Sequence, residues 1–347
     1  MKKAVIFIIL TVLTAGSGFS QSGLQTVAIV NLIRSEPITV GQLRAEVEMM
    51  EKAARVQLTK TQRMQVLDGM IIERLVIQAA ERDKIVVSDN EVNQYLQQLR
   101  SLLAQNIGRQ PTDAEFAQAV KNEFNMEVQA YRDQVRRELI RQKYIMAKKG
   151  DLLNSVKIPT EQEIQTEYNV LKSELLRPET VRFSMIQVPY GNDAASRSKA
   201  RELANNLIKE IGSNPSKFDE VSARSGAPNS GYVAGDAGFL PRNQETRELV
   251  GQEFMNAAFS LRQGQVSSLI EGKQGFQIIK ITENYSQKIL ELDDIFQLGT
   301  KTTVRDFIGQ NMINQRQQNV YLQAFQEIGS ELKSGKSFQI FENNLNW

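Results

Sequence analysis

Apolar side chains recur every three or four residues through most of the first 176 positions. Segment 61–83 shows this best, because its apolar positions all fall on one face of a helix: Met64, Leu67, Ile71, Leu75 and Ala79. The same spacing predicts a helix that begins at Thr39 and another over 126–148. Residues 27–32 are expected to form a short strand. We therefore expect a mainly helical domain here.

Three short segments predict where further helices begin. In each of 88–91, 112–115 and 160–163, a Ser or Thr is followed three residues later by Glu. This spacing is typical of a capping box, in which the hydroxyl and the carboxylate satisfy free backbone N–H groups at the start of a helix.

The period of the pattern changes near Arg177 and Pro178. From there, strands are predicted over 181–188, 265–270 and 277–283, and helices over 194–211, 218–222 and 254–261. A loop rich in Gly, Pro and Asn is expected over 225–238. Short strands interleaved with short helices indicate a compact α+β domain.

The chain returns to a helical pattern over 301–333. This helix carries more apolar surface than it can bury alone, so it needs the N-terminal helices as partners. We therefore predict a discontinuous all-helical domain built from both termini, with the α+β domain inserted. The expected parts are 21–176 (N-terminal helical domain), 177–286 (α+β domain) and 287–347 (C-terminal helical segment).

The first twenty residues have the pattern of a secretory signal. Lys2 and Lys3 precede a short apolar run over 4–13, and Gly18 and Ser20 supply the small residues of a cleavage site. We predict cleavage after Ser20, and the alternative is an uncleaved N-terminal anchor. The run is shorter than the ~20 residues that a spanning helix needs, so no permanent membrane anchor is expected.

The composition excludes several kinds of chemistry. The chain has no histidine and no cysteine, so imidazole bases, thiolates and His or Cys metal sites are absent. Its net charge is only +2, which argues against nucleic acid as a partner. Nucleotide binding is not expected either, because Gly335, Lys336 and Ser337 lack the upstream glycine of a phosphate-binding loop. We predict no cofactor and no metal.

The remaining motifs resemble a known family. Four middle segments occur in the order and spacing of a parvulin domain: AGDAGF at 234–239, FMNAAFSL at 254–261, GQV at 264–266 and GFQIIK at 275–280. Segments 30–33, 38–41, 67–75 and 131–140 resemble recurring stretches of SurA-type proteins. The mature chain as a whole resembles the parvulin-domain periplasmic chaperones of the SurA, PpiD and PrsA kind.

The resemblance also shows what the site has lost. Isomerase members of the family usually carry one histidine on the first strand of the domain and a second on the last strand. These positions map to Met185 and Gln277. The usual Cys or Asp maps to Ala227 or Pro228. None of these side chains titrates, so no catalytic residue is assigned.

The family's apolar floor is largely kept, and the resemblance predicts peptide contacts at Ala237, Val250, Phe254 and Phe259. Helical spacing alone leaves two interpretations open for Val250 and Phe254, ordinary core packing or a substrate pocket, and it favours core for Phe259. Methionines can line an adaptable binding groove. Of those in the helical region, we expect most to be core: Met49, Met50, Met64, Met70 and Met126.

We therefore expect an ATP-independent periplasmic chaperone, a holdase, for unfolded secreted proteins or outer-membrane precursors. Its parvulin domain would bind peptide but isomerise prolyl bonds weakly or not at all. The alternatives are an active parvulin-type prolyl isomerase and a secreted scaffold or adhesion protein that reuses the fold.

Overall fold

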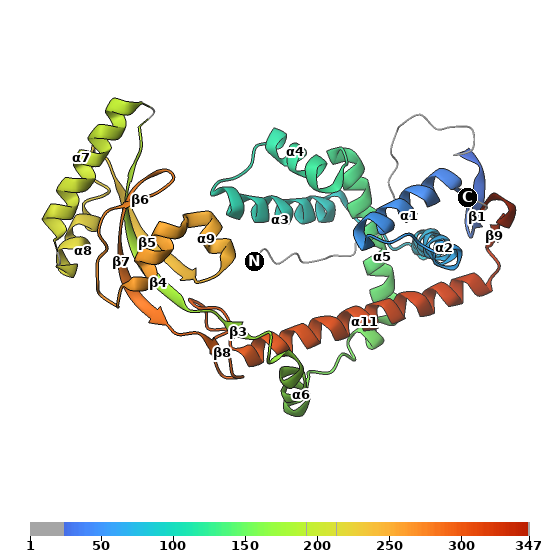
Figure 1. Ribbon diagram of the computed structural model, residues 1–347. Coiled ribbons are helices and arrows are strands. Elements are labelled where there is room, and N and C mark those ends of the chain that lie inside the picture. Colours follow the sequence, from blue (N-terminus) through green and yellow to red (C-terminus); the bar gives the residue numbers. More distant parts are fainter. Residues whose placement is uncertain (1–23, 192, 213, 346–347) are drawn as a thin grey trace. The chain divides into compact units, whose positions relative to one another are not determined.

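The computed structural model describes residues 24–191, 193–212 and 214–345, which form two compact units (Figure 1). The first unit joins residues up to Lys157 with those from Asn314 onward, and the second is Ile158–Ile313. The expected architecture, a discontinuous helical domain with an inserted domain, is thus confirmed. The predicted signal and its cleavage after Ser20 lie outside the described residues.

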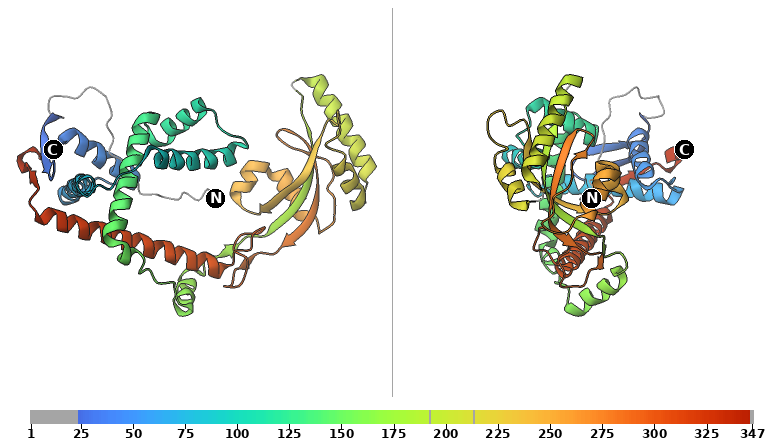
Figure 2. Two further views of the ribbon diagram at one scale, coloured as in Figure 1. Left: turned by 180° about the vertical axis from the view of Figure 1, so that it is seen from behind. Right: turned by 60° about the vertical axis from the view of Figure 1, so that its left-hand side comes forward.

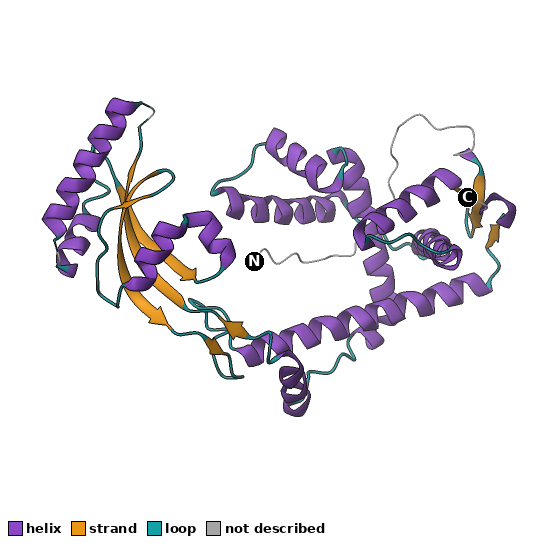
Figure 3. Cartoon of the chain, viewed as in Figure 1, coloured by secondary structure: helices purple, strands orange, loops and turns teal. Residues whose placement is uncertain are grey.

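Helices dominate the first unit (Figure 3). Its N-terminal part contains α1 (Val40–Ala54), α2 (Lys60–Arg82), α3 (Asp89–Ile107), α4 (Asp113–Phe124) and α5 (Val128–Leu153). The capping boxes predicted at Ser88 and Thr112 are confirmed, because each hydroxyl accepts a hydrogen bond from the backbone N–H three residues later, at 3.3 Å. Local sequence therefore fixes where α3 and α4 begin.

A small antiparallel sheet joins the two ends of the chain in this unit. Its strand order is β2-β1-β9, with β1 (Thr26–Asn31), β2 (Ser35–Thr39) and β9 (Phe338–Ile340), and the 3-10 helix η2 (Glu342–Leu345) follows. The strand predicted over 27–32 is confirmed, whereas β2 and β9 were not predicted. Val27, Ala28 and Val30 of β1 are fully buried in one apolar core with α1 and α2.

The long helix α11 (Val304–Ser334) supplies the partner that the sequence requires. Ala324 and Ile328 on α11 are buried against α2 and α5, in a cluster with Val76 and Ile145. Helices α11 and α2 approach closely, because a Cβ added to Gly329 of α11 would lie 2.7 Å from the Ile72 side chain of α2.

The second unit is built on a sheet with the order β5-β4-β7-β6. Its strands are β4 (Thr180–Pro189), β5 (Val233–Pro241), β6 (Ile270–Glu271) and β7 (Gly275–Tyr285). Its helices are α7 (Ala194–Ile211), α8 (Pro215–Ala223), α9 (Gln244–Val250) and α10 (Gln252–Ser260).

Alternate residues of β7 pack into two different cores, because successive side chains of a strand point to opposite faces of the sheet. Phe276 and Ile278 pack with α7 and α8, while Ile279 and Ile281 pack with α10. Figures 1 and 2 show α7 and α8 on one face of the sheet and α9 on the other.

The boundaries between the units differ from those expected at 176/177 and 286/287. Helix α6 (Glu161–Leu171), the strand pair β3 (Leu176–Arg177) and β8 (Lys288–Ile289), and the first turns of α11 all belong to the second unit. The reason is a separate apolar cluster, in which Tyr168 of α6 is buried with Leu290 and Ile308. The Tyr168 hydroxyl also donates to the Leu290 carbonyl at 3.2 Å.

Two further expectations for this unit were wrong in part. The loop expected over 225–238 ends earlier, because β5 begins at Val233. Of the strand predicted over 265–270, only an isolated bridge between Val266 and Lys280 and the short β6 are formed.

Candidate functional site

The face of the second unit's sheet that packs against α10 carries Met185 and Gln277, the two positions to which the resemblance maps the family's histidines. Met185 on β4 lies opposite Gly235 on β5 and Ile279 on β7. Its side chain is half-buried and packs against the cluster that contains Phe183 and Phe254. Met185 thus serves as an apolar contact beneath the site.

Gln277 on β7 lies opposite Gln187 on β4 and Ile270 on β6. Its Oε1 is shielded from solvent and has no hydrogen-bond partner among the described residues. The side chain turns toward Gly272, where an added Cβ would lie 2.6 Å from Oε1. Gly272 therefore leaves the space that the Gln277 amide occupies.

The predicted positions Ala227 and Pro228 lie in the connection between α8 and β5, and both are exposed. This connection is held by backbone bonds, with the Ala227 N–H donating to the Arg224 carbonyl at 3.1 Å. It is also held by the buried Tyr232 hydroxyl, which donates to the Val221 carbonyl at 2.8 Å. The two positions add no group that could transfer a proton.

The four predicted peptide-contact residues differ in burial. Phe254 is 2% exposed and meets Phe183 edge to face at 5.5 Å, so its ring is part of the core. Val250 and Phe259 are half-buried at the margin of the same cluster, and Ala237 on β5 is exposed. Peptide contact at all four positions stays a prediction. The buried Phe254 ring would act by packing beneath Val250 and Phe259.

The glycines at 235 and 238 lie within β5, where a loop was expected. Only Gly238 needs its lack of a side chain, because its φ is +81°, a conformation that favours glycine. The register between β4 and β5 shifts here, since Phe183 lies opposite Gly238 while Ser184 lies opposite Asp236. The glycine-rich stretch is thus a bulge in a strand.

Carboxylates near this bulge form ion pairs. Arg182 contacts Asp236 at 2.6 Å and Glu283 at 2.9 Å. The hydrogen bond from Arg182 lowers the pKa of Asp236, and hydrogen bonds from Tyr285 and Arg182 lower the pKa of Glu283. Both carboxylates are therefore held ionised, which suits a structural ion pair better than a general acid. Within the described ranges, no group of three or more acidic side chains is arranged to hold a metal ion.

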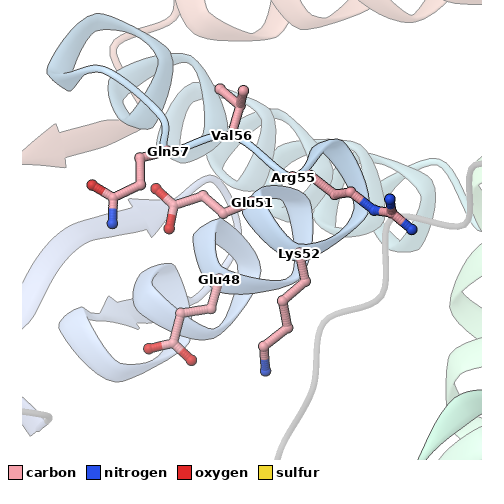
Figure 4. A pocket seen from close by; sticks show the side chains of 6 residues that line it. All are labelled: Glu48, Glu51, Lys52, Arg55, Val56 and Gln57. Carbon is pink, nitrogen blue, oxygen red and sulfur yellow. The ribbon is translucent and has the colours of Figure 1, made fainter.

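The first unit, called the helical unit below, has a shallow depression at the end of α1 with a volume of about 320 Å³ (Figure 4). Charged groups of both signs line it, including Glu48, Lys52 and Arg55. The Glu51 carboxylate at its edge accepts the Leu58 N–H at 2.7 Å and so closes the connection to α2. These features describe a surface turn and define no binding site.

The candidate methionines are mainly structural. Met70 and Met126 are buried, while Met49, Met50 and Met64 are half-buried. The exposed apolar side chains of this unit lie elsewhere, and Leu102 and Ile107 on α3 are 59% and 43% exposed. Periodicity could not find them, because it does not separate a buried stripe from one that stays open to solvent.

The helical unit also buries polar groups that sequence analysis did not single out. Glu46 on α1, Glu73 on α2, and Gln134 and Arg141 on α5 are each less than one-tenth exposed. Burial raises the pKa of Glu46 to about 7, and the charge of Glu73 adds to this effect. Burial also raises the pKa of Glu73.

Comparison with known proteins defines the class. Residues 159–296 match the PPIC-type PPIASE domain, and residues 1–145 match the SurA-like N-terminal domain. The chain thus carries a SurA-like N-terminal domain followed by a PPIC-type parvulin domain, as the resemblance implied. Within the described residues, no helix is both long and apolar enough to cross a membrane.

The relatives are distant. The foldase protein PrsA of Clostridium botulinum is 21% identical over 290 residues, which cover 83% of this chain and 76% of that protein. The chaperone SurA of Idiomarina loihiensis is 22% identical over 313 residues, covering 85% of this chain and 67% of that protein. Among solved structures, a SurA-like chaperone of Campylobacter jejuni matches with a TM-score of 0.39 at 14% identity, covering 91% of this chain and all of that one.

Proposed function

We propose that this protein is an ATP-independent periplasmic holdase for unfolded secreted proteins or outer-membrane precursors. Its parvulin domain, in this proposal, binds peptide and isomerises prolyl bonds weakly or not at all. The family relationship to foldases and chaperones supports the general role. The observation that carries the finer proposal is the replacement of the family's polar site by Met185, Ala227, Pro228 and Gln277.

These replacements remove polar groups that could stabilise the twisted amide electrostatically during prolyl isomerisation. Rotation about a peptide bond has a barrier of about 18–20 kcal/mol, and a catalyst must bind the twisted amide better than the planar one. Groups that stabilise the carbonyl in the twisted state supply much of that preference. Met185 offers no hydrogen bond, and Gln277 is a neutral amide, so we expect little rate enhancement.

Holding an unfolded chain needs apolar surface that adapts to many sequences. Leu102 and Ile107 on α3 provide exposed apolar side chains in the helical unit. Val250 and Phe259 provide half-buried ones beside the parvulin sheet. Neither group selects a particular side chain, which is consistent with broad client binding.

Two assays on the mature protein test the proposal. Light scattering should show that aggregation of a denatured client is suppressed at near-stoichiometric ratios without nucleotide. A protease-coupled assay on a short Xaa-Pro peptide should show a rate close to the uncatalysed one. A high rate that falls in the Gln277→Ala variant would instead establish an active isomerase. That alternative is kept because the Gln277 Oε1 has no partner within the described structure.

A further inference from the structure

Gln134 on α5 is a buried amide whose two polar atoms both lack a hydrogen-bond partner in the part of the chain that the structure describes. The side chain is 5% exposed, and neither Oε1 nor Nε2 makes a hydrogen bond to any described residue. A primary amide can accept two hydrogen bonds and donate two. Buried polar groups are almost always paired in folded proteins, because an unpaired one destabilises the fold. The two unpaired atoms of one side chain therefore call for an explanation.

The position of Gln134 on α5 shows which side of the helix it occupies. Gln134 precedes Glu138 by four residues, so the two lie on the same face. Glu138, with Arg137 and Arg141, acts electrostatically on the buried Glu73 of α2. The Gln134 amide thus lies on the polar side of α5, one helical turn before this charged group.

The same unit shows what a buried glutamine can do with a polypeptide. Gln78 on α2 is fully buried, and its Oε1 accepts from the backbone N–H of Leu32 and Ile33 at 3.0 Å each and of Arg34 at 3.4 Å. Its Nε2 donates to Glu36 at 3.2 Å. This amide binds the main chain between β1 and β2, whereas no described segment of the chain bonds to Gln134 in this way.

We propose that Gln134 binds the main chain of an unfolded polypeptide client, with Oε1 accepting from a client N–H and Nε2 donating to a client C=O. This inference rests on the holding function proposed above. An unfolded client supplies the required groups, because every residue except proline carries a backbone donor and an acceptor. These groups are the same in all sequences, so the contact adds affinity without selecting side chains. Since Gln134 is shielded in the free protein, client entry requires a local opening of the helical unit.

The test compares two peptides and two variants of the mature protein. The first peptide is short, apolar and fluorescently labelled, and the second has the same sequence with N-methyl groups on alternate backbone nitrogens. Fluorescence anisotropy gives the Kd of each. Because N-methylation removes donor groups, we expect it to weaken binding to the unaltered protein roughly three- to tenfold. In Gln134→Met, N-methylation should have no effect, and the parent peptide should bind more weakly by about the same factor.

The matched control is Gln129→Met, since Gln129 is exposed on the same helix and its Nε2 donates to Asp133 at 3.3 Å. It should behave like the unaltered protein. Thermal unfolding should show Gln134→Met at least as stable, because an apolar side chain of similar size removes an unsatisfied buried amide. Weaker binding would then not reflect unfolding.

Two outcomes would overturn the inference, each in a distinct way. If Gln134→Met binds both peptides as the unaltered protein does, the amide has no role in client binding and buried water satisfies it. If the unaltered protein binds neither peptide and leaves client aggregation unchanged, the holding function itself fails, and this inference fails with it.

Discussion

A buried carboxyl in the helical unit should make the stability of the protein depend on pH. Glu46 on α1 is 3% exposed, and its Oε1 has no partner among the described residues. Burial raises its pKa to about 7, and repulsion from Glu73 adds to the rise. Burial raises the pKa of Glu73 as well, although Arg74, Arg141 and Arg137 oppose that rise.

The direction of the effect follows from proton binding. Between the ordinary value of 4.5 and about 7, the folded state holds the Glu46 proton while the unfolded state releases it. The free energy of unfolding therefore falls as the pH rises through this window, and this contribution is constant above it. At about 1.4 kcal/mol per pKa unit, the loss amounts to about 3 kcal/mol.

Glu46→Gln tests this magnitude, because glutamine keeps the shape and cannot ionise. Urea unfolding at pH 4 and pH 8, followed by circular dichroism, gives the free energy of unfolding of both proteins. We expect the variant to be more stable than the unaltered protein by about 3 kcal/mol at pH 8 and nearly equal at pH 4. Glu48→Gln is the control, since Glu48 is exposed on the same helix. A difference between Glu46→Gln and the unaltered protein that stays the same at both pH values would refute the reasoning.

Three further changes have defined outcomes. Gly329→Ala should lower the free energy of unfolding of the helical unit by about 1–3 kcal/mol, seen in urea melts, because its Cβ would lie 2.7 Å from Ile72; an unchanged midpoint would contradict the packing. Phe254→Ala should destabilise the parvulin unit by about 3–5 kcal/mol in thermal unfolding, while the helical unit keeps its resistance to proteolysis; parallel loss of both units would show that they do not unfold separately. Removal of 336–347 deletes β9 and should expose β1 to limited proteolysis, because β1 pairs with β9; unchanged protection would refute that role.

Local patterns predicted most of the fold. Capping boxes located the starts of α3, α4 and α6, since those signals act within four residues. The discontinuous domain followed from apolar surface on α11 that had to be buried elsewhere. The boundary between the two units could not be predicted from local patterns, because the packing of Tyr168 against Leu290 joins positions that are 122 residues apart. Strand β9 was missed for a similar reason, as its partner β1 lies at the other end of the chain.

The candidate site was predicted less completely. The resemblance placed Met185 on the first strand of the domain and Gln277 on the last, and the structure adds that the strands carrying them, β4 and β7, are paired. The burial of Phe254 and the exposure of Ala237 could not be read from spacing, because burial depends on which helix covers the sheet. The unpaired amide of Gln134 gave no signal at all, since a glutamine between charged helical residues suggests a solvated face.

The most direct test of the proposed holding function compares one client in two states. The mature protein is mixed, without nucleotide, with a permanently unfolded form of a small protein and with its native form, and the complex is measured by analytical size-exclusion chromatography. We expect a complex with the unfolded form only, because the native form buries the apolar and main-chain groups that a holdase binds. Absence of a complex with the unfolded form, or equal binding of both forms, would contradict the proposal.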